Sequence, residues 1–341
     1  MKKIVKHILR GLSIVFVSLL GLILLILIAL QTPFAKSKLA DFAELQVEKN
    51  LNAHLDIGKV EGNFINGLNL KQVTFITSTD TMAKIQSLKV KYQLLPLLSG
   101  KIVVNTAEIN RPEFRLEQYK DGSWNFEHLA KPRKESPKKV SPFSMKVTVE
   151  NFRLNNARLQ LLSKNKMLPK RISDFYVGGS GEYSVGHFKI NLKNFCFNAK
   201  QPNLQIKNLH FRLEQQNENF QLSDFILQTP KNKLTAHAKI DISFSETSTL
   251  TFKTEPLFLD EFSSFLPSGY DIKIHPEIQL STVLEEQNLQ LALKLSDRAE
   301  TLHISVFSPQ IGTILQKNKL ADNAAFIVKA EFDQIQLNNW I

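Results

Sequence analysis

The sequence contains a single cysteine, Cys196, among its 341 residues. One cysteine cannot close a disulfide within the chain, so the fold must be held together by packing and hydrogen bonds. Cys196 lies between two phenylalanines in a strand-like stretch, which favours a structural residue over a reactive thiol. A disulfide framework is therefore excluded.

The sequence also lacks the short motifs of common catalytic and cofactor sites. GxSxG, HExxH, GxxxxGK[ST] and CxxC are absent, and the eight histidines are scattered singly. Gly178-Gly179-Ser180-Gly181 resembles a phosphate-binding loop in composition alone, because no helical pattern follows it, so we expect a hairpin turn there. Asp121-Gly122 is also expected to be a turn rather than a metal site. We therefore expect no enzyme activity, no catalytic residues, no cofactor and no metal.

One long hydrophobic run is present, the stretch of about 19 uncharged residues from Leu12 to Leu30. Its length matches the roughly 20 residues that a helix needs to cross a bilayer. Basic residues precede the run and uncharged residues follow it, so the positive-inside rule places the N-terminus in the cytoplasm. A cleaved signal peptide is the alternative, but its apolar region is usually ~7–15 residues long and ends in a small-x-small site. We expect residues 1–31 to be a cytoplasmic basic flank and a single-pass signal anchor in a bacterial inner membrane, with the bulk of the chain periplasmic.

The formal net charge of +11 is concentrated in two places. Four positive charges precede the apolar run, and the proline-rich stretch 131–142 adds a net four. The remaining residues carry a net charge of only +3, so no nucleic-acid partner is expected. Residues 131–142 are predicted to be a basic, solvated linker or loop.

Secondary structure is predicted from the periodicity of apolar residues. Thr32-Pro33 is a helix-start signal, and residues 32–53 are predicted to form an amphipathic helix. From His54 onward, short runs alternate with Gly, Asn and Asp breaks, which is typical of strands in a meander. Residues 257–266 and 311–320 are the only later segments with a helical pattern. The 24 phenylalanines, against 5 tyrosines and 2 tryptophans, can either fill a core or line an apolar binding surface.

A six-residue pattern recurs: apolar, any residue, Asn/Asp/Gln, apolar, any residue, apolar. Its copies are residues 70–75, 149–154, 172–177, 192–197, 206–211, 222–227 and 332–337. The first two apolar positions are three residues apart, which breaks the two-residue period of a strand. A bulge or bend at the polar residue would return both side chains to one face, and Asn and Asp tolerate such a backbone.

A sheet bent in this way at successive strands would curl into a trough. Its inner face would carry the second apolar residue of the copies, namely Phe152, Phe175, Phe195, Leu209 and Phe225. The predicted fold class is therefore mainly β: an N-terminal transmembrane helix, a repetitive antiparallel sheet curled into a groove, and few short helices. A β-sandwich with loose self-similarity is the alternative.

Residues 94–129 resemble the AsmA-like proteins, including the TamB branch. The resemblance consists of Pro-Leu-Leu-x-Gly-Lys at residues 96–101, Ile-x-x-Pro-x-x-x-Leu around Pro112, and Asp-Gly-x-Trp-Asn at Asp121, Gly122, Trp124 and Asn125. Residues 60–68 are similar to the segment that opens the first β layer in that family. Residues 54–130 are thus identified as an AsmA-like β domain, followed by the linker 131–142 and a repetitive β-groove region, 143–341.

The resemblance implies an inner-membrane-anchored periplasmic protein with an apolar β-groove. Such a protein would move phospholipid toward the outer membrane or support outer-membrane assembly, with phospholipid, the inner membrane and an outer-membrane assembly protein as expected partners. The alternative is a periplasmic β-sandwich module that binds a protein or glycan partner without transporting lipid. Family members are commonly much longer, so this chain is either a short member or an N-terminal piece of one.

Overall fold

The computed structural model describes residues 32–77, 80–131, 146–243, 246–265, 275–285, 288–298, 300–309 and 326–334. The predicted anchor 1–31, most of the linker 131–142 and the predicted helix 311–320 lie outside these residues. Everything below refers to the described part of the chain.

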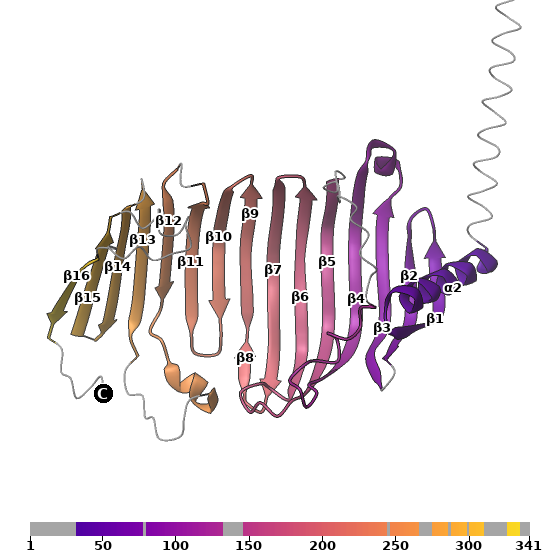
Figure 1. Ribbon diagram of the computed structural model, residues 1–341, viewed down its shortest axis with the longest axis horizontal. Coiled ribbons are helices and arrows are strands. Elements are labelled where there is room, and N and C mark those ends of the chain that lie inside the picture. The colour runs from indigo at the N-terminus through magenta and orange to yellow at the C-terminus, as the bar shows by residue number, and fades with distance from the viewer. Residues whose placement is uncertain are drawn as a thin grey trace, which may run out of the picture.

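The described strands form one long sheet, seen face-on in Figure 1. It has 16 strands, which follow one another in nearly the order of the sequence. Strand β8 extends β9 and pairs with β7. The strand bounds are β1 Ala53–Asn63, β2 Gly67–Thr77, β3 Thr81–Gln93, β4 Lys101–Glu117, β5 Lys146–Leu162, β6 Arg171–Ser184, β7 His187–Lys200, β8 Leu204–Ile206, β9 Asn208–Gln216, β10 Asn219–Gln228, β11 Lys233–Asp241, β12 Ser248–Thr254, β13 Glu277–Glu285, β14 Asn288–Asp297, β15 Glu300–Ser308 and β16 Ile327–Asp333.

The sheet is antiparallel except at one pair. Strands β4 and β5 run parallel, with Ile102 opposite Val147 and Leu116 opposite Leu161. This corrects the predicted meander. The physical reason is that the long connection 118–145 brings the chain back to the starting end of β4, as a crossover between parallel strands must.

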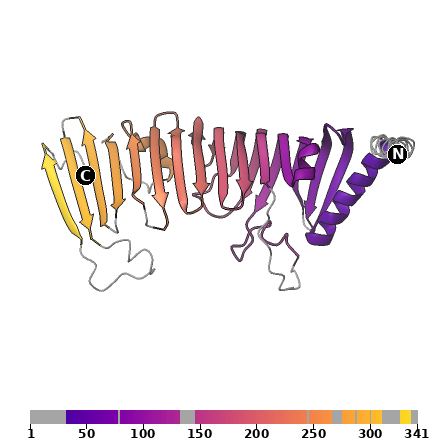
Figure 2. The ribbon, with the colours of Figure 1, turned by 90° about the horizontal axis from the view of Figure 1, so that it is seen from above.

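Helix α2 (Pro33–Asn50) packs against β1 at the N-terminal end of the sheet (Figure 2). The carboxylate of Glu44 accepts a hydrogen bond of 3.2 Å from the backbone N–H of Ile57 in β1. This contact satisfies a donor on an edge strand, and the helix shields that edge from pairing with another chain. The chain between α2 and β1 is also held to the segment that follows β4, because the Asn52 N–H donates to the carbonyl of Leu129 at 2.7 Å.

The polar position of the six-residue pattern bends the strands as predicted. Gln72, Asp174, Asp224 and Gln334 all have a left-handed backbone, with φ between 52° and 55°. In two further copies the strand register shifts. The shift lies between Val149 and Phe152 in β5. In β7 it lies between Leu192 and Asn194, which pair with Gly179 and Gly178 of β6. In the copy at 206–211, the bend separates β8 from β9. The last copy continues past residue 334 and leaves the described residues.

Several bends lie side by side on neighbouring strands. Arg111 in β4, Asn156 in β5 and Asp174 in β6 have φ of 45°, 52° and 52°, and the registers place them at nearly one level. In β1, Gly58 lies against the bend at Gln72, where an added Cβ would come within 2.9 Å of the Gln72 amide oxygen. A line of bends that crosses successive strands curls the sheet about its long axis.

The glycine cluster 178–181 lies inside β6 and is not the predicted hairpin turn, which forms instead at Val185-Gly186. The cause is close approach rather than chain reversal. A Cβ on Gly178 would lie 2.8 Å from the Tyr176 hydroxyl, and one on Gly179 would lie 2.5 Å from the Asn191 carbonyl oxygen. Glycine in a strand interior commonly marks such a contact.

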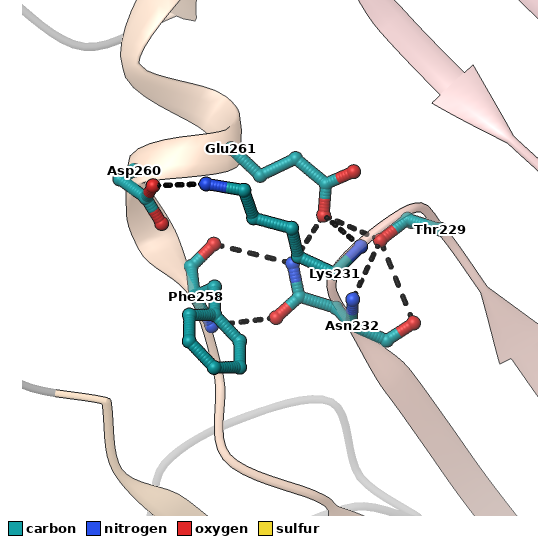
Figure 3. A network of polar contacts seen from close by, with 6 residues as sticks. All are labelled: Thr229, Lys231, Asn232, Phe258, Asp260 and Glu261. Carbon is teal, nitrogen blue, oxygen red and sulfur yellow. Dashed lines mark hydrogen bonds and ion pairs between the residues drawn. The ribbon is translucent and has the colours of Figure 1, made fainter.

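The short helix η2 (Leu259–Phe265) lies within the segment 257–266 and docks on the β10–β11 turn (Figure 3). The buried side-chain amide of Asn232 bonds both backbone groups of Phe258, accepting at 2.6 Å and donating at 3.1 Å. The carboxylate of Glu261 accepts from the Thr229 hydroxyl at 2.5 Å and from the Asn232 amide at 2.5 Å. Asp260 adds an exposed ion pair with Lys231. These bonds fix the β12–β13 connection to the lower rim of the sheet.

The described strands all belong to this single sheet, so a second sheet packed on it, as in the β-sandwich alternative, is not part of the described structure. Few side chains are fully buried as a result. The buried apolar residues include Ile57, Val73, Ala83, Leu154, Ala157, Ala199 and Ala238. Figure 2 shows the sheet as a gently arched band.

The left-handed bend at Asp224 can be tested by substitution. A left-handed backbone costs most residues roughly 1–2 kcal/mol, but Asn and Asp tolerate it because their short polar side chains form local hydrogen bonds, whereas β-branched residues fit it worst. Asp224→Val should therefore lower the free energy of unfolding by about 1–2 kcal/mol relative to Asp224→Asn. Both variants lose the exposed ion pair to Arg212, so that loss cancels in the comparison. Urea unfolding in detergent, followed by circular dichroism, measures the difference. Equal stabilities of the two variants would contradict the argument.

The docking of η2 can be tested at Glu261. Glu261→Ala leaves the hydroxyl of Thr229 and the amide of Asn232 without their shared acceptor, and both residues are 2% exposed. We expect a loss of about 1–3 kcal/mol in the free energy of unfolding, and a smaller loss for Glu261→Gln, which keeps an acceptor oxygen. The matched control is Asp260→Ala, which breaks only an exposed ion pair worth ~0–1 kcal/mol. An Asp260→Ala loss as large as that of Glu261→Ala would refute this account of the network.

Candidate functional site

One face of the sheet is apolar across the N-terminal strands. Residues opposite one another on neighbouring strands point to the same face, so the register identifies rows of side chains. One such row crosses seven strands, β1 to β7, without a polar residue: Val60, Leu70, Leu88, Ile109, Leu154, Val177 and Phe195.

The same face stays apolar across the C-terminal strands. A second row crosses seven strands from β10 to β16: Phe225, Ala236, Phe252, Leu280, Leu293, Ile304 and Ala330. In β9, Phe211 is opposite Leu192 of β7 and stacks on Phe225 with ring centroids 6.4 Å apart. The apolar face is therefore continuous along the whole described sheet.

Aromatic side chains are concentrated near the middle of this face. The rings of Phe175, Phe195 and Phe197 meet edge to face, with centroids 5.3 to 6.2 Å apart. Phe188 and Phe220 form a similar pair at 6.2 Å. Such edge-to-face geometry fixes the rings relative to one another, so the middle of the face is a preformed aromatic surface.

The five residues predicted for the inner face all lie on this apolar face, and each is half-buried: Phe152, Phe175, Phe195, Leu209 and Phe225. The prediction omitted Phe197, Phe211 and Leu154, which lie on the same face. Each of these is the last residue of its pattern copy, two positions after a residue that was identified. The two-residue period of a strand would therefore have found them.

The opposite face is polar and charged. The row adjacent to the first apolar row reads Glu61, Asn69, Lys89, Glu108, Arg153, Gly178 and Asn194. Hydrogen bonds from Lys71 and Lys59 lower the pKa of Glu61 to about 2, so this carboxylate stays charged at any physiological pH. Hydrogen bonds from Asn198 and Ser173 likewise lower the pKa of Asp174.

A cleft of about 520 Å³ lies on the charged face, over β3 to β6. Its lining includes Arg115, Arg158 and Arg171, and two of these arginines are paired with carboxylates, Arg115 with Asp80 and Arg158 with Glu113. None of the five predicted inner-face residues lines this cleft. The charged cleft and the apolar face are therefore separate features on opposite sides of one sheet.

Neither of the two apolar rows contains the AsmA-like motif residues Pro112, Asp121, Gly122, Trp124 and Asn125. Pro112 is buried within β4, directly after the left-handed Arg111, at a bend where a strand tolerates a residue without an N–H. Asp121 and Gly122 form a turn, as predicted, in which Gly122 has φ of 90° and the Asp121 carboxylate accepts from the backbone N–H and hydroxyl of Ser123 at 3.0 and 2.6 Å. The hydroxyl contact lowers the pKa of Asp121.

Trp124 and Asn125 complete this turn after β4. The indole of Trp124 stacks on Phe126 with ring centroids 6.0 Å apart. Asn125 donates from its backbone N–H to the Glu117 carbonyl at 2.9 Å and from its side chain to the Arg115 carbonyl at 3.1 Å. These contacts fold the start of the crossover back onto the end of β4, so the motif shapes the connection between the two parallel strands.

The described side chains do not form a cluster of three or more His, Cys, Asp or Glu that could hold a metal ion. Cys196 is a free, half-buried thiol whose strand neighbours Phe195 and Phe197 point to the apolar face. Among the described helices, none combines the length and hydrophobicity needed to cross a membrane. The run Leu12–Leu30 lies outside the described residues.

Comparison with known proteins gives one family. Neither the curated proteins nor the solved structures gave a significant match to the chain. The AsmA family model matches residues 8–173, which include the apolar run, helix α2, strands β1 to β5 and the crossover motif. This match confirms the resemblance predicted from the sequence: residues 8–173 are similar to the AsmA family.

Proposed function

We propose that this protein handles phospholipid in the bacterial envelope by holding acyl chains on the apolar face of its sheet. It acts without catalysis, moving lipid toward the outer membrane or supporting outer-membrane assembly. The single observation that carries the proposal is the pair of apolar rows, each seven strands long, on one face of a sheet whose other face is charged.

The energetics of hydrocarbon transfer suit such a surface. Moving an acyl chain through water costs about 0.8 kcal/mol for each exposed CH₂ group. Moving it from a bilayer onto an apolar protein face exchanges one apolar environment for another, so the net change is small in both directions. A continuous apolar path therefore lowers the barrier to transfer without trapping the lipid.

An uncovered apolar face also needs an occupant. Soluble monomers rarely expose contiguous apolar patches larger than a few hundred Å², and larger patches mark sites of interaction. In the described residues no second sheet covers these rows. Curling of the sheet at the bends would bring the two rims toward each other and turn the face into the inner wall of a groove.

The proposed location follows from the sequence outside the described residues. The run Leu12–Leu30 with its basic N-terminal flank supports a single-pass anchor in the inner membrane, with the sheet in the periplasm. The N-terminal strands would then receive lipid from that membrane. An outer-membrane assembly protein is the proposed partner beyond the far end of the sheet.

A second candidate function is that of a periplasmic interaction module that binds a protein or glycan. Strand β16 favours it, because its Ile327, Val328 and Phe332 side chains are between 63% and 67% exposed. An exposed apolar edge strand is a template for pairing with a strand of another protein. This candidate requires no lipid on the apolar rows, so the same experiment separates the two.

Photo-crosslinking in cells tests the lipid proposal. A photoreactive residue at Phe175, Phe195 or Phe225 should form covalent adducts with phospholipid, because these side chains lie on the apolar face. The matched control is Arg153, which is next to Phe152 in β5 but belongs to the polar row. Lys193 and Lys207, both exposed, are further controls. The absence of lipid adducts at all three phenylalanines would reject lipid handling in favour of the interaction module.

A charge placed on the apolar face should interrupt lipid contact without unfolding the sheet. Phe195 is half-buried in a face that no second sheet covers, so an aspartate at this position keeps part of its hydration. We expect Phe195→Asp to lower the free energy of unfolding by about 1.5–3 kcal/mol, the value of the lost phenylalanine burial. Lipid adducts at Phe175 and Phe225 should also decrease. Lys193→Asp is the control for added charge on the same strand.

The outcome of this substitution also reports on the architecture. In an enclosed core the same carboxylate would be buried without a partner, and the domain would unfold. Collapse of the Phe195→Asp variant, measured by protease sensitivity, would therefore argue against an open apolar face.

A further inference from the structure

The turn between β3 and β4 carries exposed leucines. Its short helix η1 (Leu95–Ser99) has no buried residue, and the side chains of Leu95 and Leu98 are 80% and 88% exposed. Leu94 and Leu97 are also exposed, at 37% and 43%. Four leucines within five residues thus form an apolar projection at the upper rim of the sheet, the small helix above β3 and β4 in Figure 1. We call residues 94–98 the leucine tip.

The leucine tip is a well-formed structure rather than a loose loop. The Leu97 N–H donates to the Leu94 carbonyl at 3.1 Å, and the Ser99 hydroxyl donates to the Pro96 carbonyl at 2.9 Å. Gly100 ends the turn with φ of 70° and donates its N–H to the Leu97 carbonyl at 3.1 Å. These bonds hold the leucines outward, although exposing apolar side chains to water does not stabilise the turn. Exposed apolar side chains held in a fixed geometry indicate an interaction site.

Helix α2 carries three exposed apolar side chains at the same end of the sheet. Phe34, Phe42 and Leu45 are 73%, 57% and 58% exposed. At 3.6 residues per turn, their spacing places them within about 80° of one another around the helix. Glu44 lies on a different side of the helix, where it bonds to β1. Lys38 and Lys49 lie in the same sector, so the helix has one side toward the sheet and a mixed face of apolar and basic side chains away from it.

We infer that the leucine tip inserts into the surface of the membrane that the run Leu12–Leu30 enters, as a second contact beside the anchor. The inference rests on the anchoring included in the proposed function. The apolar run ends three residues before α2 begins at Pro33, so the first turn of α2 lies close to that membrane. The leucine tip lies on the third and fourth strands, about 10–15 Å along the sheet from β1.

The flanking chemistry agrees with a lipid surface. The exposed Lys91 and Lys101 stand on either side of the leucine tip. Leucines that enter the acyl region with lysines at the level of the phosphates are the arrangement of interfacial membrane contacts. Contact at two separated points, the anchor and the leucine tip, would fix the orientation of the sheet and hold the first rows of the apolar face against the lipid source.

The experiment places a fluorophore on single cysteines of the full-length protein, one copy per nanodisc. The background carries Cys196→Ser, and the labelled variants are Leu95→Cys, Leu98→Cys, Thr32→Cys and Val185→Cys. The nanodiscs contain phosphatidylethanolamine and phosphatidylglycerol, with or without a nitroxide on the acyl chains. Thr32 reports on the anchor. Val185 is the matched control, since it is 56% exposed and lies on the same rim, but about 25–30 Å from β1.

Nitroxide lipids should quench the fluorescence of labels at positions 95, 98 and 32. The fluorescence of a label at position 185 should not change. Leu95→Ser combined with Leu98→Ser should abolish quenching of a label on a further variant, Leu97→Cys, whereas Val185→Ser should leave that quenching unchanged. Quenching at 32 without quenching at 95 and 98 would overturn the inference and leave the anchor standing. A bright label at 32 would reject the anchor and the inference together.

Two other outcomes would also overturn the inference. Quenching at 185 as well as at 95 would show that the whole rim lies on the membrane and that the leucine tip has no special role. A blue-shifted emission at 95 and 98 that nitroxide lipids do not quench would show that protein, rather than lipid, covers the leucine tip.

Discussion

The structure depends on keeping apolar side chains on one face of strands up to 17 residues long. A regular strand alternates its faces, so two apolar residues three positions apart would point in opposite directions. The left-handed polar residue between them restores a common face, at a cost of roughly 1–2 kcal/mol for a residue with a Cβ. The alternative is to turn a phenylalanine or leucine to the charged face, which forfeits about 1.5–3 kcal/mol of burial and shifts the side chains that follow. The bend therefore costs less free energy than exposing an apolar side chain on the charged face. Because the bend recurs in successive strands, the sheet acquires both its apolar face and its curl.

A single sheet with one apolar face is an unusual way to build a stable domain, because the usual solution packs a second layer on that face. Here the stabilising contacts are between neighbouring strands of the same sheet. Each interior strand has hydrogen-bonding neighbours on both sides, and the apolar rows place large side chains in contact across strands. Small residues such as Ala157, Ala199 and Ala238 are almost fully covered between larger neighbours. Stability is thus distributed along the sheet, and in the described part of the chain no second sheet covers the apolar face.

Much of the local structure could be predicted from the sequence. The bends at Gln72, Asp174 and Asp224 were readable because a polar residue interrupts an otherwise regular apolar period. Helix α2 was readable from its start signal at Thr32-Pro33.

The glycines 178–181 were misread, because composition does not distinguish a chain reversal from a strand that another backbone approaches closely. The parallel pairing of β4 with β5 was also missed, since alternation identifies a strand but says nothing about its neighbour or its direction. The candidate site was also predicted only in part. The phenylalanines of the apolar face could be identified from their spacing in the sequence, whereas the leucine tip could be identified only from the exposure of its side chains in the structure.

The parallel seam between β4 and β5 also bears on how the sheet folds. Most other neighbouring strands are joined by connections that let them pair soon after they are synthesised. The seam joins residues 45 positions apart, as at Asn155 and Asn110, whose side chains bond at 2.8 Å. Pairing between strands far apart in the sequence loses the conformational entropy of the closed loop before stabilising contacts form, so it slows folding. The four strands before the seam and those after it are therefore expected to form as two separate nuclei. Their union at β4 and β5 would be the late, rate-limiting event that joins two short apolar surfaces into one continuous path.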